Sequence, residues 1–361
     1  IQHRMGASFP CCGIILSQLS SQYFGEGRYR IVRQLGKGAY GNILVCKAKG
    51  SDKECAAKML DAVQIPLTNI EQEAKILQKM DHPNVVKCHE VIREARSVYI
   101  VMDRLEIDLL RSMIGHVKTQ GIIPYNVSSM IIYQMALSIS YLHSCNIVHR
   151  DIKGDNFLCE RRDFTTAENR IVLTDFGAAV ELRSPDMRLH EACGTTRYWA
   201  PEFYELDYQI KVDIWALGVI IYNLLTGRFP FRNKAQVNTK VLTFADVPQP
   251  LQDLAFACLE RSEDKRTSAE DLLRCQELKM EKACTEPLKA VSSLVKKNVS
   301  ELQLDEVGRS SSTPKLGEAC GAAEKKSPWT LEEACSILAE HSTEAGRGIL
   351  SSIEGSRTSS I

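Results

Sequence analysis

The sequence has no excess charge of either sign and no long apolar run. Lys plus Arg and Asp plus Glu each number 45, so the net charge at pH 7 is zero. Such a balance gives no global electrostatic reason to bind nucleic acid or an anionic membrane. No apolar stretch reaches the roughly 18–20 residues that a membrane-spanning helix needs. We therefore expect neither a nucleic-acid partner nor a transmembrane span.

The cysteines lack the spacing of a disulfide framework or a zinc site. Thirteen Cys are scattered over 361 residues without a C-x-x-C pair, and the eight His do not cluster with them. An odd number of unpaired cysteines is typical of reduced thiols. The expected location is cytoplasmic or nuclear.

The N-terminal residues offer one alternative to that location. Met5-Gly6, with Cys11 and Cys12 downstream, resembles an acylated N-terminus, but Pro10 stands where the myristoylation pattern needs Ser or Thr. We expect a flexible leader over residues 1–27. Membrane association through N-terminal lipidation is kept as the less favoured alternative.

Hydrophobic periodicity predicts a strand-rich part followed by a helix-rich part. Strands are predicted over residues 29–36, 41–48, 54–60 and 97–103. Helices are predicted over residues 69–80, 125–145 and 213–226, the last one ended by Gly227. This order predicts an α+β chain of two lobes, with an N-lobe over about 28–103 and a C-lobe over about 104–276.

From about residue 277 onward the composition becomes small and polar. Segments such as "SSSTPK" and "EGSRTSSI" are typical of disordered linker, so we expect residues 277–361 to be largely disordered. Two short helical segments are predicted within this tail, at 286–303 and 329–341. The first combines an apolar stripe with lysines, a pattern compatible with an autoinhibitory or calmodulin-binding helix; a linker is the favoured interpretation.

The stretch "LGKGAYGNI" places three glycines between two predicted strands. Gly36, Gly38 and Gly41 would let a hairpin backbone close over phosphate groups without side-chain collisions. A glycine-rich hairpin without a ligand is the alternative. A Rossmann turn is disfavoured because a strand, rather than a helix, follows the glycines.

A lysine and a glutamate are candidates for a buried ion pair. Lys58 ends the apolar strand "CAAK", where it is either an edge residue reaching water or a fixed cation for phosphate oxygens. Glu73 shares the apolar face of the predicted helix with Ile70 and Leu77, so it should point toward the core. Glu71 should be solvated.

The segment "NIVHRDIKGDNFL" at 146–158 concentrates charge between two short apolar brackets. We predict short strands at the brackets Ile147-Val148 and Phe157-Leu158, which would fix the loop to the interior. Asp151 could orient a hydroxyl nucleophile and accept its proton. Lys153 would neutralise charge on a migrating phosphoryl group.

Two further oxygen donors accompany this loop. Asn156 lies in the same segment, and Asp175 follows a predicted strand in "LTDFG". Carboxylate and amide oxygens converging from separate strand ends suit Mg²⁺. Each piece alone has an ordinary interpretation as a capped turn; the order of the pieces favours a site.

Taken in order, these motifs resemble the signature set of the eukaryotic protein kinase family. The resemblance covers roughly residues 28–276 and rests on "GKGAYGNI", "CAAK", "HRDIKGDN", "DFG", "APE" at 200–202 and "DIWALGV" from 213. It implies a bilobal α+β fold, with a small, mostly β N-lobe and a larger, mostly α C-lobe. It also implies ATP and Mg²⁺ as cofactors.

The resemblance further implies a role for each candidate residue. Asp151 would be the catalytic base beside Lys153, Lys58 and Glu73 the paired cation and carboxylate, and Asn156 and Asp175 the metal ligands. The nucleotide-binding positions would be Leu35, Gly36, Gly38, Gly41, Ile43, Ala56, Lys58, Met102, Asp103, Leu105 and Leu158. Glu202 and Arg266 would form a structural bridge in the second lobe. The stretch from Lys58 to Glu73 is shorter than is usual in the family, which predicts a clipped first helix.

Two segments indicate the type of kinase that the chain resembles. "DIKGDN" and Thr195 in "CGTTRYWAPE" are similar to serine/threonine kinases, which implies transfer of the ATP γ-phosphate to Ser or Thr hydroxyls of protein substrates. "TGRFPF" resembles the calcium/calmodulin-dependent branch. Two alternatives stay open: a nucleotide-binding pseudokinase scaffold and a small-molecule phosphotransferase.

One position of the resemblance suggests how activity is controlled. Many members of the family phosphorylate a residue four positions before the Thr of "CGT", and the phosphate pairs with the Arg of HRD. Glu191 occupies that position here, so the resemblance implies a permanent ion pair with Arg150, with His190 adding a contact. An exposed acid without such a role is the alternative.

Overall fold

A computed structural model describes residues 23–38, 41–166, 168–275 and 278. The described residues form two compact units, one made of 23–81 and 86–105 and the other of 82–85 and the residues from 106 onward. The helices predicted at 286–303 and 329–341 lie outside the described residues. Within the described part, no helix combines the length and apolarity that a membrane crossing requires.

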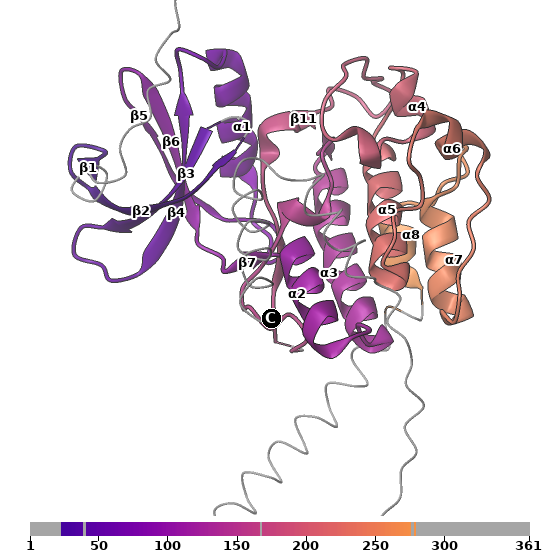
Figure 1. Cartoon of the computed structure of the whole chain (residues 1–361). Coiled ribbons are helices and arrows are strands. Elements are labelled where there is room, and N and C mark those ends of the chain that lie inside the picture. The colour runs from indigo at the N-terminus through magenta and orange to yellow at the C-terminus, as the bar shows by residue number, and fades with distance from the viewer. Residues whose placement is uncertain (1–22, 39–40, 167, 276–277, 279–361) are drawn as a thin grey trace, which may run out of the picture. The chain divides into compact units, whose positions relative to one another are not determined.

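The first unit is built on a six-stranded antiparallel sheet in the order β1-β2-β3-β4-β6-β5 (Figure 1). Its strands are β1 (Tyr23–Phe24), β2 (Tyr29–Gly38), β3 (Gly41–Ala48), β4 (Glu54–Asp61), β5 (Cys88–Arg93) and β6 (Ser97–Asp103). Every strand predicted in this part of the sequence is therefore confirmed. The first unit is therefore mostly β, as predicted for the N-lobe.

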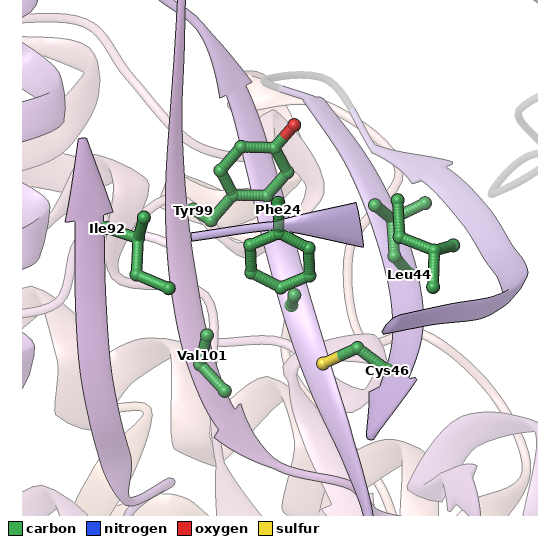
Figure 2. Packing of buried hydrophobic residues seen from close by; sticks show 8 residues of the cluster. Phe24, Leu44, Cys46, Ile92, Tyr99 and Val101 are labelled. Carbon is green, nitrogen blue, oxygen red and sulfur yellow. The ribbon is translucent and has the colours of Figure 1, made fainter. Parts of the chain in front are cut away.

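One face of this sheet carries an apolar cluster, hereafter the sheet core (Figure 2). Its members are Phe24, Ile31, Leu44, Cys46, Ala57, Ile92, Tyr99 and Val101. The ring of Phe24 stacks on Tyr29 and on Tyr99, with centroid distances of 5.1 and 4.3 Å. Such stacked pairs stabilise beyond the area that they bury.

The sheet core corrects the predicted start of the folded region. The sequence predicts a flexible leader through residue 27, but β1 pairs with β2 and Phe24 is only 2% exposed. The chain then turns through Gly25, Glu26 and Gly27, all at positive φ. Two strand residues followed by such a turn are too short to show a hydrophobic period, which is why the pattern missed them.

The helix of the first unit, α1 (Leu67–Lys79), follows from an apolar face with a 3.6-residue period. Its buried residues are Ile70, Glu73, Ala74, Ile76 and Leu77. The predicted orientation of Glu73 toward the interior is confirmed. Glu71 is partly exposed and binds Arg93 instead, with Nη2–Oε2 at 2.6 Å.

The second unit is mostly helical (Figure 1). Its α-helices are α2 (Leu109–Gln120), α3 (Tyr125–Ser144), α4 (Pro201–Tyr204), α5 (Val212–Thr226), α6 (Lys234–Thr239), α7 (Gln249–Cys258) and α8 (Ala269–Arg274). Helix α5 is buried from Val212 through Leu225 and ends at Gly227, which has a φ of 72°. A Cβ atom on Gly218 would lie 2.7 Å from Cβ of Cys258, so glycine allows α7 to pack closely against α5.

Short strands bracket the charged loop as predicted. β8 (Ile147–Val148) pairs with β11 (Val180–Glu181), and β9 (Phe157–Cys159) pairs with β10 (Ile171–Leu173) and β7 (Ile107–Asp108). The loop is therefore anchored at its two ends in two different small sheets. This arrangement leaves its polar groups little freedom to move.

The boundary between the units differs slightly from the predicted one at 103/104. The first unit extends to Leu105, and His82–Val85 belongs to the second unit although it precedes β5 in sequence. Asn84 explains this placement, because its Nδ2 donates to Ile171 O at 2.8 Å and to Gln134 Oε1 at 3.0 Å. Buried polar atoms need such partners.

We expect Phe24→Ala to lower the free energy of unfolding by about 3 kcal/mol, because it removes a stacked ring from the sheet core. Tyr23→Ala is the matched control, since the neighbouring side chain is 60% exposed, and should change stability by less than about 0.5 kcal/mol. Urea denaturation of both variants measures the difference. If both substitutions lowered the free energy of unfolding equally, residues 23–27 would belong to the leader and not to the folded unit.

Candidate active site

A buried carboxylate holds the backbone of the charged loop. Asp213, in the first turn of α5, is 1% exposed. Its Oδ2 accepts from His149 N at 2.8 Å, and its Oδ1 accepts from Arg150 N at 2.9 Å. His143 Nε2 lies 3.1 Å from the same Oδ2. The carboxylate thus satisfies two consecutive backbone donors that would otherwise be buried without acceptors.

The backbone that Asp213 holds is in an unfavourable conformation. Arg150 has a φ of 64°, a left-handed value that L-residues rarely adopt. Gly194, from the segment before APE, comes so close to this residue that an added Cβ would lie 2.3 Å from Arg150 O. Only glycine fits there, and its own φ of 73° also requires it.

Asp151 lies next to this strained residue, with three side chains directed at its carboxylate. Lys153 Nζ donates to Oδ2 at 2.8 Å, and Thr195 Oγ1 donates to Oδ1 at 2.8 Å. Asn156 Nδ2 donates to Asp151 O at 2.8 Å and lies 3.3 Å from Oδ2. Donors of this kind satisfy the carboxylate oxygens and fix the orientation of the side chain.

Asn156 and Asp175, the predicted metal ligands, lie on neighbouring segments. Thr174 N donates to Asn156 O at 2.9 Å, so the residue before Asp175 is bound to the backbone of Asn156. Asn156 contacts Asp151 through Nδ2, so its Oδ1 is not the atom that binds Asp151. Asp175 has a φ of 61°, a left-handed value at the end of β10. An amide oxygen and a carboxylate on hydrogen-bonded segments are a donor set that fits Mg²⁺.

The residue after Asp175 anchors this pair in the interior. Phe176 is fully buried, and its ring meets His149 edge to face at a centroid distance of 5.1 Å. His149 Nε2 lies 3.1 Å from Thr174 O. The histidine of the charged loop therefore contacts both residues that flank Asp175. It links the two segments and has no solvent exposure of its own.

The first unit contains the predicted cation–carboxylate pair. Lys58 Nζ lies 2.7 Å from Glu73 Oε1, and the residues are 6% and 4% exposed. Each side chain gives the other a buried partner of opposite charge. The short connection before α1 was expected to clip the helix; the helix nevertheless has 13 residues and places Glu73 against Lys58.

Strand register places the predicted nucleotide residues of the sheet on one face. Ile43 is opposite Lys58, and Ala56 is opposite Met102. Because directly opposite residues share a face and alternate residues along a strand do too, all four side chains lie on the face away from the sheet core. The sheet thus separates an apolar core face from a face that carries one buried cation.

The other predicted nucleotide residues have varied surroundings. Gly36 and Gly38 end β2 opposite Ile43 and Gly41. Gly41 has a φ of 154°, and an added Cβ would lie 2.2 Å from Met59 O. Of the remaining predicted positions, Leu35 is 43% exposed and Leu105 is 8% exposed. Asp103 Oδ1 lies 3.0 Å from His89 Nε2. Leu158 belongs to β9 in the second unit.

An ion pair joins the charged loop to the segment before APE. Arg150 Nη1 lies 2.9 Å from Glu191 Oε2, as the resemblance implied, and Arg150 Nε donates to Ala178 O at 2.7 Å. The Arg150 side chain is 7% exposed and that of Glu191 is 78% exposed. The predicted extra contact from His190 is wrong, because His190 Nδ1 lies 2.8 Å from Leu206 O instead.

A bidentate ion pair stabilises the second unit as predicted. Arg266 Nη1 and Nη2 lie 2.5 and 3.0 Å from the two carboxylate oxygens of Glu202. The guanidinium of Arg266 also stacks over Trp215 at 5.1 Å, and Arg266 is 1% exposed. Planar bidentate pairing of this kind is specific to arginine.

The structure adds three residues to the candidate site. The sequence identifies Thr195 only as a marker of kinase type and Asp213 only as the start of "DIWALGV". It gives no role to Tyr208, whose hydroxyl donates to Glu191 O at 2.6 Å. The motifs "CGTTRYWAPE" and "DIWALGV" contain Thr195 and Asp213, but no local pattern in the sequence indicates Tyr208.

Comparisons with known proteins agree with this geometry. Residues 29–276 match the family described as "Protein kinase domain". Serine/threonine-protein kinase PLK4 of Drosophila persimilis is 31% identical over 272 residues, which is 71% of this chain and 34% of that protein. Serine/threonine-protein kinase DCLK2 of Mus musculus is 36% identical over 215 residues, 57% of this chain and 27% of that protein. The chain spans about a third of the length of these curated relatives.

We expect Asp213→Asn to release the backbone of the charged loop. An amide group retains one acceptor and presents a donor to the second N–H, so stability should fall by about 1–3 kcal/mol. Hydrogen exchange of the His149 and Arg150 amides should speed up. Asp246→Asn is the control, because Asp246 is exposed and asparagine tolerates its φ of 57°. Unchanged exchange at both amides would contradict the anchoring role.

Proposed function

The chain belongs to the protein kinase family, and on that premise we propose that it transfers the γ-phosphate of ATP to Ser or Thr hydroxyls of protein substrates. The observation that carries this proposal is the Asp151 carboxylate, with Lys153 Nζ and Thr195 Oγ1 each 2.8 Å away. A carboxylate held in this way can orient a hydroxyl and accept its proton. The neighbouring ammonium can stabilise negative charge on the transferred group.

The proposal gives each polar residue a step in phosphoryl transfer. Lys58, paired with Glu73, would bind phosphate oxygens of ATP. Asn156 and Asp175 would hold Mg²⁺, which neutralises charge on the phosphates when it is bound. Asp151 would orient the acceptor hydroxyl and take its proton. Positioning and electrostatics supply most of the catalysis in this reaction class.

Two rival functions are less well supported. A pseudokinase scaffold would not need Lys58, Asp151, Asn156 and Asp175 together, yet all four are present. A small-molecule phosphotransferase would not need the base to contact the segment before APE, whereas Thr195 binds Asp151 directly. The compared relatives carry the name serine/threonine-protein kinase.

Finer assignments concern the kinase branch, the C-terminal segment and the location. We propose membership of the calcium/calmodulin-dependent branch from "TGRFPF" alone, and calmodulin or autoinhibitory binding by residues 286–303 from the sequence pattern alone. A cytoplasmic or nuclear location is proposed from the eight described cysteines, all of which have free thiols. N-terminal lipidation remains the less favoured alternative.

We expect Asp151→Asn to lower kcat about a hundredfold or more while ATP binding persists, because the substitution removes the base but leaves the ligands of phosphate and metal. Asp175→Ala should abolish Mg²⁺-dependent transfer, and chelation of Mg²⁺ should do the same to the unmodified protein. Labelled ATP with mixed protein and small-molecule acceptors measures all three. Label found only on small molecules would favour a small-molecule phosphotransferase. The absence of any labelled acceptor would favour a pseudokinase scaffold.

We further propose that Glu191 takes the place of an activating phosphate. Its carboxylate lies 2.9 Å from the Arg150 guanidinium, which is buried and needs a counter-charge. Tyr208 holds the backbone of Glu191 from the other side, with its OH 2.6 Å from Glu191 O. The pair therefore ties the segment before APE to the charged loop without any modification.

Phosphatase-treated protein should accordingly keep its activity, and Glu191→Ala should lower it severalfold because the guanidinium of Arg150 loses its counter-charge. Ser184→Ala is the control, since this residue lies on the same segment without contacting Arg150 in the described hydrogen bonds. Transfer rates before and after dephosphorylation measure the effect. Loss of activity on dephosphorylation, traced by mass spectrometry to Thr195, Thr196 or Ser184, would exclude this role for Glu191.

A further inference from the structure

Two cysteines of the first unit lie directly opposite each other on neighbouring strands. Cys46 of β3 pairs with Cys55 of β4 in the antiparallel register. Both belong to or pack against the sheet core, so their side chains share a face of the sheet. Figure 2 shows Cys46 with its sulfur among the side chains of this cluster. Both thiols are free in this structure.

The separation of opposite strand residues suits a disulfide. Directly opposite residues in an antiparallel pair have Cα atoms about 4.5–5.5 Å apart, and disulfides span Cα distances of about 4.4–6.8 Å. The two other cysteines within strands have different partners. Cys88 is opposite Met102, and Cys159 is opposite Ile171. The register thus distinguishes Cys46 and Cys55 from these cysteines.

We propose that Cys46 and Cys55 form a reversible cross-strand disulfide when the protein meets hydrogen peroxide. Cys55 is partly exposed and reacts first, whereas Cys46 is fully buried and acts second. The Cys55 thiolate attacks the peroxide, an S–O bond forms, the O–O bond breaks, and hydroxide leaves. The Cys46 thiolate then attacks the Cys55 sulfur, and hydroxide leaves again as the S–S bond forms. Two thiols lose two electrons and two protons, and the peroxide becomes two waters.

The surroundings of the two thiols set the rate at which the disulfide forms. Burial raises the pKa of Cys46 to about 12, and burial also raises the pKa of Cys55, with Lys53 opposing and Asp103 adding to that shift. Tyr29, whose own pKa is raised to about 12 by burial, is the nearby ionisable group on β2. Since the thiolate is the reactive form, the cross-link should form slowly near pH 7 and faster as the pH rises.

The cross-link would act on the strands that carry the nucleotide face. Cys46–Cys55 is one register step from Val45–Ala56 and lies on the same two strands as Ile43–Lys58. The cysteines point to the sheet core, and Lys58 points to the opposite face, so the bond would tie β3 to β4 without contacting the ion pair. Closing a loop in the unfolded chain stabilises the folded state.

Peptide mapping of the full chain tests this proposal. Lys47, Lys49 and Lys53 lie between the two cysteines, so trypsin separates the peptides 38–47 and 54–58 unless a disulfide joins them. After peroxide treatment and alkylation of the remaining thiols, we expect the joined peptides by mass spectrometry. Dithiothreitol should separate them, and their yield should rise between pH 7 and pH 9.

Variants keep the test specific. Cys55→Ser should abolish the joined peptides, whereas Cys88→Ser, a partly buried cysteine in the same sheet, should leave them unchanged. Oxidised wild-type protein should unfold a few °C higher than reduced protein, and Cys55→Ser should show no such shift. Absence of the joined peptides while other cysteines become oxidised, a yield that does not depend on pH, or an unchanged unfolding temperature would each overturn the proposal. None of these readouts depends on kinase activity.

Discussion

The carboxylate of Asp213 is the constraint on which the candidate active site depends. It accepts from two consecutive backbone N–H groups, those of His149 and Arg150, at 2.8 and 2.9 Å. These two hydrogen bonds keep Arg150 at a positive φ. The turn at this residue places Asp151 beside Lys153 and Thr195. Asp213 lies on α5, which is buried from Val212 through Leu225, so the hydrophobic core itself fixes the position of Asp151.

In the first unit, a single strand register sorts side chains into two environments. One face of the sheet packs Phe24 against Tyr99, and the other carries Lys58 opposite Ile43. Side chains alternate between faces with a period of two, so a slip of one residue in β4 would move Lys58 into the sheet core. The apolar cluster therefore protects the position of the cation as well as the stability of the unit.

Patterns within single segments predicted much of this arrangement. The apolar period of residues 69–80 was enough to place Glu73 inside and Glu71 outside, because a helix surface is set by its own sequence. Contacts over long separations were not accessible in the same way. Asp213 is more than 60 residues from its partners, and Tyr208 reaches Glu191 through an isolated antiparallel bridge between Leu189 and Tyr208. β1 was missed because two residues cannot show a period.

Arg150 shows how these constraints combine. Its backbone is held by Asp213 and approached by Gly194, and its side chain is held by Glu191 and Ala178 O. These contacts come from α5, from the segment before APE and from the residues after Asp175, yet all act on one residue next to Asp151. A positive φ at a non-glycine residue is unfavourable on its own and persists only when its surroundings over-determine it. Because the guanidinium is buried while Glu191 is exposed, the carboxylate can leave more easily than the arginine can move. The exposed end of this ion pair thus lies on the segment before APE, and its buried end lies next to Asp151.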